Sequence, residues 1–195
     1  MRTRRSVRFV ALAAALALLP GAAAPAYAGT RVPEQEKTRA AAVATAEMNI
    51  ARQVQKELRR MPYYSVFDNI EYQVQGYTVI LSGETIRPTL KSEAEARVKK
   101  IEGVEKVMNR IEVLPLSSHD DRIRRATYRA IFGHSAMARY ALQPVPSIHI
   151  IVKNGHVRLV GVVANEADKN LAYIQAGGVP GAFSVTNELR VERRG

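Results

Sequence analysis

The sequence predicts an α+β fold made of two tandem αββαβ domains, each a three-stranded mixed sheet covered by two helices on one face. The first observation behind this prediction is an internal repeat with an offset of 78 residues: Ser82-Gly83 recurs as Val160-Gly161, and residues 103–109 recur as residues 181–187. The second is that the hydrophobic period changes from helical to alternating in the same order in both copies. Each copy has roughly 70 residues, which is near the lower limit for a self-sufficient core, so we expect the two to support each other.

The first helix of each copy is predicted from apolar residues at helical spacing. In the first copy Ile50, Val54 and Leu58 fall on one stripe, and Met61-Pro62 ends the helix. The matching stripe in the second copy consists of Ile123, Thr127, Ala130 and Ile131. Both helices are therefore expected to be amphipathic.

A β-hairpin is predicted after each of these helices. The second copy has β-rich runs over 148–152 and 156–160, joined by Asn154-Gly155. Asn-Gly favours the type I′ turn because both central residues need positive φ. The first copy has the equivalent runs 70–74 and 77–81, joined at Gln75-Gly76.

A second helix and a final strand complete each copy. The helices are expected over 88–101 and 166–176, and the strands over 106–113 and 183–191. Alternating apolar residues, Phe183 among them, are expected on the helix-covered face of the final strand, and an asparagine, Asn109 or Asn187, interrupts the alternation at the same point in both copies. A right-handed crossover would place this strand parallel to the second strand of the hairpin.

The first 28 residues have the pattern of a secretory signal peptide. Four arginines between residues 2 and 8 are followed by an apolar core over 9–19 and an Ala26-Tyr27-Ala28 cleavage site. The core is too short to span a bilayer, which needs about 20 apolar residues. Arg4-Arg5 leaves twin-arginine export open beside the Sec route. The sequence has no cysteine, which excludes a lipid-modified cysteine, disulfides and thiol catalysis, and we expect a periplasmic or secreted protein.

The net charge indicates an anionic partner. The formal charge is +11, and without the four leader arginines it is +7. A basic exported protein is attracted to surfaces such as phospholipid headgroups, and export argues against nucleic acid. The expected organisation is a signal peptide at 1–28, an alanine-rich charged helical lead at 29–46, a first domain at 47–114, a linker at 115–119 and a second domain at 120–193.

Several segments of the first copy resemble the BON domain, named for bacterial OsmY and nodulation proteins. They are Leu81-Ser82-Gly83, residues 101–107 (IEGVEKV) and residues 109–113 (NRIEV). The second copy is a weaker match, with Pro180 where the first has Glu102. A tandem pair behind a signal peptide resembles the OsmY type. The resemblance implies a periplasmic, non-enzymatic protein that attaches to phospholipid membranes or partner proteins and is tied to osmotic or envelope stress.

We predict no catalytic, cofactor-binding or metal site. The four histidines are scattered over a linker, a loop and two strands, without zinc-ligand spacing on a helix. Ser82-Gly83-Glu84 lacks the first glycine of a nucleophile elbow. An enzyme remains a distant third hypothesis.

The candidate binding residues crowd the first helix of the second copy. They are Arg122, Arg124, Arg125, Tyr128, Arg129 and Phe132. Basic residues beside aromatic ones suit the interface of an anionic membrane. Alternatively, the two aromatic residues complete the core while the arginines solvate the helix. The leading hypothesis is attachment to anionic phospholipid, and the rival is a protein-interaction or chaperone-like module that holds other exported proteins by its sheet edges or interdomain groove.

Overall fold

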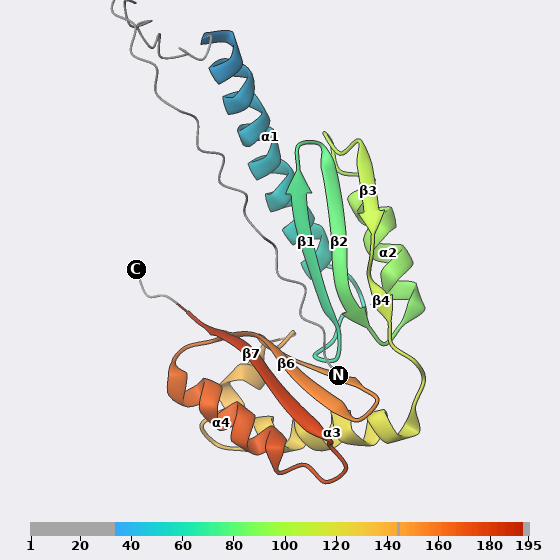
Figure 1. The fold of residues 1–195 in the computed structure, drawn as a ribbon, viewed down its shortest axis with the longest axis vertical. Coiled ribbons are helices and arrows are strands. Elements are labelled where there is room, and N and C mark those ends of the chain that lie inside the picture. Colours follow the sequence, from blue (N-terminus) through green and yellow to red (C-terminus); the bar gives the residue numbers. More distant parts are fainter. Residues whose placement is uncertain (1–33, 144, 193–195) are drawn as a thin grey trace, which may run out of the picture. The chain divides into compact units, whose positions relative to one another are not determined.

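The computed structural model describes residues 34–143 and 145–192, and these residues form the two predicted αββαβ units, one after the other (Figure 1). The predicted signal peptide and residues 29–33 of the lead lie outside the described residues. Domain 1 runs from α1 to β4 and domain 2 from α3 to β7. The fold class expected from the repeat is confirmed.

Domain 1 is a mixed sheet with two helices packed against one face (Figure 1). Its elements are α1 (Glu34–Arg59), β1 (Asn69–Gln75), β2 (Thr78–Thr85), α2 (Pro88–Val98), β3 (Lys106–Asn109) and β4 (Glu112–Val113). Strand β1 is antiparallel to β2, and β2 is parallel to both β3 and β4. The final strand is thus parallel as expected, but it is divided after Asn109. Helix α1 passes through residue 46, so the described part of the lead and the first helix are continuous.

Domain 2 repeats this arrangement with one addition. Its elements are α3 (Ser118–Phe132), a 3₁₀ helix η1 (Ala138–Leu142), β5 (Ile148–Lys153), β6 (His156–Val163), α4 (Glu166–Gly177) and β7 (Ser184–Val191). The sheet order is β5-β6-β7, with β5 antiparallel and β7 parallel to β6. The Ser117 hydroxyl caps α3 by accepting from the Asp120 N–H, so the helix begins inside the predicted linker.

Glycine is required at two repeated positions because the backbone of the adjacent chain segment lies too close for a side chain. Gly83 in β2 and Gly161 in β6 have φ of +99° and +124°. A Cβ at either position would lie 2.0 Å from a backbone carbonyl oxygen, that of Asn69 at the start of β1 or that of Ser147 just before β5. Because no side chain fits there and positive φ favours glycine, these residues of the repeat serve the fold.

The repeated asparagines fasten the last strand of each domain to its second helix. The Asn187 amide donates to the Lys169 carbonyl at 2.9 Å, and its Oδ1 accepts from the Leu189 N–H at 3.2 Å. Asn109 makes the same two bonds, to the Lys91 carbonyl and from the Ile111 N–H, at 2.9 and 3.2 Å. The interruption in the apolar alternation is therefore a structural hydrogen-bonding position.

In each domain, a carboxylate of the first helix accepts hydrogen bonding from backbone N–H groups of the hairpin turn. Both carboxylate oxygens of Asp120 accept from the turn, one from the Asn154 N–H at 2.9 Å and one from the Gly155 N–H at 2.8 Å. In domain 1 the Gly76 N–H donates to Glu47. We call the contact between the helix carboxylate and the turn, which is present in both domains, the helix-to-turn clip.

The segment between α1 and β1 joins the two domains. The Ile150 N–H of β5 donates to the Val66 carbonyl at 2.8 Å, and the Val66 side chain belongs to the core of domain 2. A small second cluster consists of Ile86, Leu114, Ile151 and Val160. The two domains therefore support each other through buried apolar contacts, as their size led us to expect.

Candidate functional site

Three of the predicted binding residues form an exposed row on α3. Arg122, Arg125 and Arg129 are all exposed, and their spacings of three and four residues place them on one face of the helix. We call these three residues the α3 basic stripe. These three arginines are therefore accessible to a partner, and their role in binding stays a prediction.

Arg124 is not a surface residue, and its prediction as a binding residue was wrong. It is only 3% exposed. Its guanidinium donates to the Val152 carbonyl in β5 and to the Asp121 carboxylate, both at 2.6 Å. The arginine thus ties α3 to the sheet, and its charge is balanced inside domain 2.

The two predicted aromatic residues also belong to the core side of α3. Phe132 is 7% exposed and lies in the core of domain 2, so the prediction that it contacts a partner was wrong. Tyr128 is half-buried, with ring centroids 4.8 Å from Phe132 and 6.3 Å from Phe67. The alternative interpretation, in which these rings complete the core, describes their positions correctly.

The α3 basic stripe is electrostatically uncompensated. Within residues 34–143 and 145–192, no carboxylate lies within 4 Å of its three guanidinium groups. The one polar contact of the stripe to another side chain there joins Arg122 and the His119 ring nitrogen Nδ1 at 3.5 Å. Three positive charges therefore face solvent from one side of one helix.

Two cations at the end of α2, Arg97 and Lys99, are paired with carboxylates, in contrast. Arg97 pairs with Glu93 at 2.8 Å and with Glu57 of α1 at 3.4 Å. Lys99 pairs with Glu95 at 2.6 Å, and hydrogen bonds from Lys99 and Asn109 lower the pKa of the Glu95 carboxyl. Arg97 and Lys99 are therefore paired, unlike the three arginines of the α3 basic stripe.

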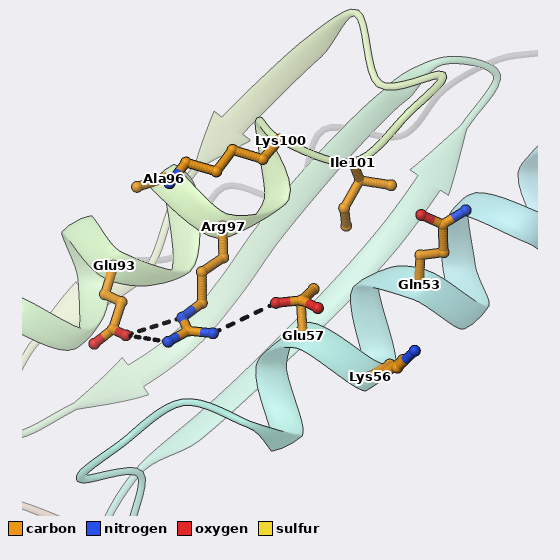
Figure 2. A pocket seen from close by; sticks show the side chains of 8 residues that line it. All are labelled: Gln53, Lys56, Glu57, Glu93, Ala96, Arg97, Lys100 and Ile101. Carbon is orange, nitrogen blue, oxygen red and sulfur yellow. Dashed lines mark hydrogen bonds and ion pairs between the residues drawn. The ribbon is translucent and has the colours of Figure 1, made fainter.

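A groove with a volume of about 600 Å³ lies between α1 and α2. Figure 2 shows Arg97 reaching across it from α2 to Glu57, while Lys56 points away from that ion pair. The lining residues are Gln53, Lys56, Glu57, Glu93, Ala96, Arg97, Lys100 and Ile101. Its central cation, Arg97, already has two carboxylate partners, and the residues that line the groove include no histidine or hydroxyl group.

Metal ligands do not gather in the described residues. Between residues 34 and 192, Pro144 aside, no group of three or more His, Asp or Glu side chains is placed to hold a metal ion. His149 lies 5.7 Å from the Tyr64 ring, and burial lowers the pKa of its imidazole. No helix in the same residues is long and apolar enough to cross a membrane.

Phe183 was expected on the covered face of the last strand, and this expectation was wrong. The residue is 72% exposed and lies just before β7, which begins at Ser184. A signal for this was available in the repeat, since the counterpart of Phe183 in the first copy is Glu105, a residue suited to solvent.

Comparison with known proteins places the chain in a family. The model of the BON domain matches residues 46–115 and 134–193, and α3 with its basic stripe precedes the second matched segment. Comparison with curated protein sequences gives no match.

Two solved structures are also matched, both of CdsD, a structural protein of the type III secretion system of Chlamydia trachomatis. One is the C-terminal domain, at 14% identity over 74% of this chain and 98% of that chain, with a TM-score of 0.28. The other, at 13% identity over 74% and 92%, has a TM-score of 0.27. These values support no conclusion about function. The family model covers more than half of the sequence, in two segments, and the chain therefore belongs to the BON domain family, with two BON domains in tandem.

Proposed function

We propose that this protein is a non-enzymatic, exported binding protein that attaches to anionic phospholipid surfaces and supports the integrity of the bacterial envelope under osmotic or envelope stress. The observation that carries the proposal is the uncompensated α3 basic stripe. BON domains are generally non-catalytic modules, and the expected signal peptide would deliver the protein to the periplasm or the exterior.

The three charges of the stripe can supply enough binding free energy for attachment to an anionic surface. Each cation close to an anionic lipid surface contributes about 1 kcal/mol, so Arg122, Arg125 and Arg129 together contribute about 3 kcal/mol. This is roughly a hundredfold in affinity. Salt screens such contacts because the Debye length falls to about 3 Å at 1 M ionic strength, and attachment should therefore weaken as salt is raised.

The repeated residues support a binding role over a catalytic one. Gly83 and Gly161 allow backbones to approach, and Asn109 and Asn187 fasten strands to helices. Both pairs serve the fold. With the offset of 73 residues that aligns Ile50 with Ile123, the counterparts of the stripe in α1 are Asn49, Arg52 and Lys56, so two of its three positions are basic in both copies.

Flotation with liposomes tests the proposal. The purified mature protein, starting at Gly29, should float with phosphatidylglycerol or cardiolipin vesicles at low salt, and it should stay at the bottom of the gradient with pure phosphatidylcholine vesicles. Absence from the anionic vesicles at low salt would remove the lipid proposal.

A protein partner is the second candidate, favoured by strand β7. This eight-residue strand pairs only with β6 among the described residues, so its outer edge can accept an extended segment of another chain. A specific partner that is recovered from a periplasmic extract and stays bound at high salt would favour this candidate over lipid.

A further inference from the structure

We propose that Phe183 is an apolar anchor that inserts into the bilayer beside the α3 basic stripe. This inference rests on the proposed function, since it names the residue that would fix the protein in an anionic lipid surface. In this proposal, the exposed Phe183 ring makes the apolar contact with the bilayer, and Arg122, Arg125 and Arg129 make the contacts with the anionic headgroups.

Phe183 is exposed and at the same time firmly held. Its side chain is 72% exposed, yet its N–H donates to the Gly155 carbonyl at 2.8 Å. The ring lies so close to Gly155 that a Cβ there would be 2.6 Å from Cδ2 of the phenylalanine. The rings of His119 and His156 flank it, with centroids 6.0 and 5.9 Å away. The aromatic ring is therefore presented in a set position and is not a loosely attached surface residue.

The support beneath the ring is rigid because three elements meet there. The helix-to-turn clip joins the start of α3 to the β5–β6 turn through Asp120, which is 1% exposed. His119 at the start of α3 and His156 at the start of β6 contact the ring that precedes β7. A side chain already fixed in its bound position loses little conformational entropy on insertion, which favours affinity.

The anchor is continuous with the α3 basic stripe. His119 contacts the Phe183 ring on one side, and its Nδ1 lies 3.5 Å from the Arg122 guanidinium on the other. An apolar ring next to a row of cations is the arrangement that binds the interface of anionic bilayers, where the ring enters the acyl boundary and the cations stay at the headgroups.

Domain 1 shows that the fold does not require an aromatic residue here. Glu105 occupies the equivalent position, and its N–H donates to the Tyr77 carbonyl at 2.9 Å, as the Phe183 N–H does to that of Gly155. Glu105 is exposed, so the same backbone position carries a negative charge in one domain and a phenyl ring in the other. Domain 1 therefore lacks, at this position, the apolar ring that Phe183 supplies in domain 2.

Tryptophan fluorescence tests this directly because the chain contains no tryptophan. The mature Phe183→Trp protein has a single reporter at the proposed anchor. With phosphatidylglycerol vesicles its emission should shift to shorter wavelength, and lipids brominated along their acyl chains should quench it. The matched control is Leu142→Trp, at an exposed apolar residue at the end of η1 that is 84% exposed; its emission should not change.

A second variant measures the contribution of the ring. Phe183→Ser should weaken binding to phosphatidylglycerol vesicles about tenfold, as expected for withdrawing one large apolar side chain from the bilayer. Leu142→Ser should bind as the wild type does. Serine should leave the fold intact, since the polar Glu105 stands at this position in domain 1, and circular dichroism checks this.

The outcomes separate the two proposals. If Phe183→Trp floats with the vesicles but its emission is unchanged, or if Phe183→Ser binds as tightly as the wild type, the anchor is refuted and the proposed function stands. If the wild-type protein does not float with anionic vesicles, the proposed function and the anchor fail together.

Discussion

Two neighbouring arginines of α3 are expected to respond in opposite ways to the same substitution. Arg124 is 3% exposed and donates to the Val152 carbonyl and to Asp121. Arg125 is exposed. We predict that Arg124→Met destabilises the protein markedly and that Arg125→Met does not.

The magnitude follows from the groups that Arg124 leaves behind. The Val152 carbonyl belongs to a fully buried residue, and a buried acceptor without its donor costs about 1–3 kcal/mol. The Asp121 side chain is 46% exposed and can hydrate, so the loss of its ion pair costs less than about 1 kcal/mol. Methionine replaces most of the apolar stem. The expected loss is about 2–3 kcal/mol, which corresponds to roughly 5–10 °C in melting temperature when the two domains, about 160 residues together, unfold as one unit.

Thermal unfolding followed by circular dichroism measures both variants. Arg125→Met should stay within about 0.5 kcal/mol of the wild type, as exposed substitutions usually do. A fall of less than about 2 °C for Arg124→Met, or an equal fall for both variants, would refute the assignment of Arg124 to the interior.

Three further substitutions test the fold. Gly161→Ala should lower the free energy of unfolding by more than about 4 kcal/mol or prevent folding. The control Gly177→Ala, with open space around the residue, should be neutral or stabilising. Equal expression and equal melting temperatures of the two variants would contradict the close approach of β5 and β6. Asn187→Ala should lower the free energy of unfolding by about 2 kcal/mol for two lost hydrogen bonds, seen as a lower urea midpoint; an unchanged midpoint would show that these bonds do not stabilise the last strand. Burial outweighs the nearby Asp68 charge and lowers the pKa of His149 below its ordinary value of about 6.5. The unfolded chain therefore binds more protons, and stability should fall as pH drops below about 6.5; His149→Gln should flatten this part of a pH–stability curve, and a variant as steep as the wild type would argue against a buried neutral imidazole.

The order of elements could be predicted because it depends on local chemistry that the repeat displays twice. Glycine at a position of positive φ, the Asn154-Gly155 turn and the helical stripe of Ile50, Val54 and Leu58 each act over a few residues. Because both copies show the same pattern, the choice between helix and strand is clearer for each segment than it would be from one copy. The parallel final strand then follows from the handedness of the crossover.

The site was harder to predict because exposure depends on which face of an element is covered. Arg124 lies seven residues, about two helical turns, before Ile131 and so shares the core side of α3. Helical spacing alone would have indicated this position, but the positive charge of arginine led to the prediction of a surface residue. Phe183 was assigned by alternation to a strand that begins one residue later. The contact of Val66 with the core of domain 2 has no local signal, since it joins segments far apart in the sequence.

Charge reversal of the α3 basic stripe tests the central claim most directly. The mature protein carrying Arg122→Glu, Arg125→Glu and Arg129→Glu is compared with one in which three exposed cations of α1 are reversed, Arg52→Glu, Lys56→Glu and Arg59→Glu. Both variants change the net charge equally, and both should melt close to the wild-type temperature. The account predicts that the α3 variant loses more than tenfold in affinity for phosphatidylglycerol vesicles, while the α1 variant loses much less. Equal losses would mean that net charge alone directs attachment, and unchanged binding of the α3 variant would contradict the site.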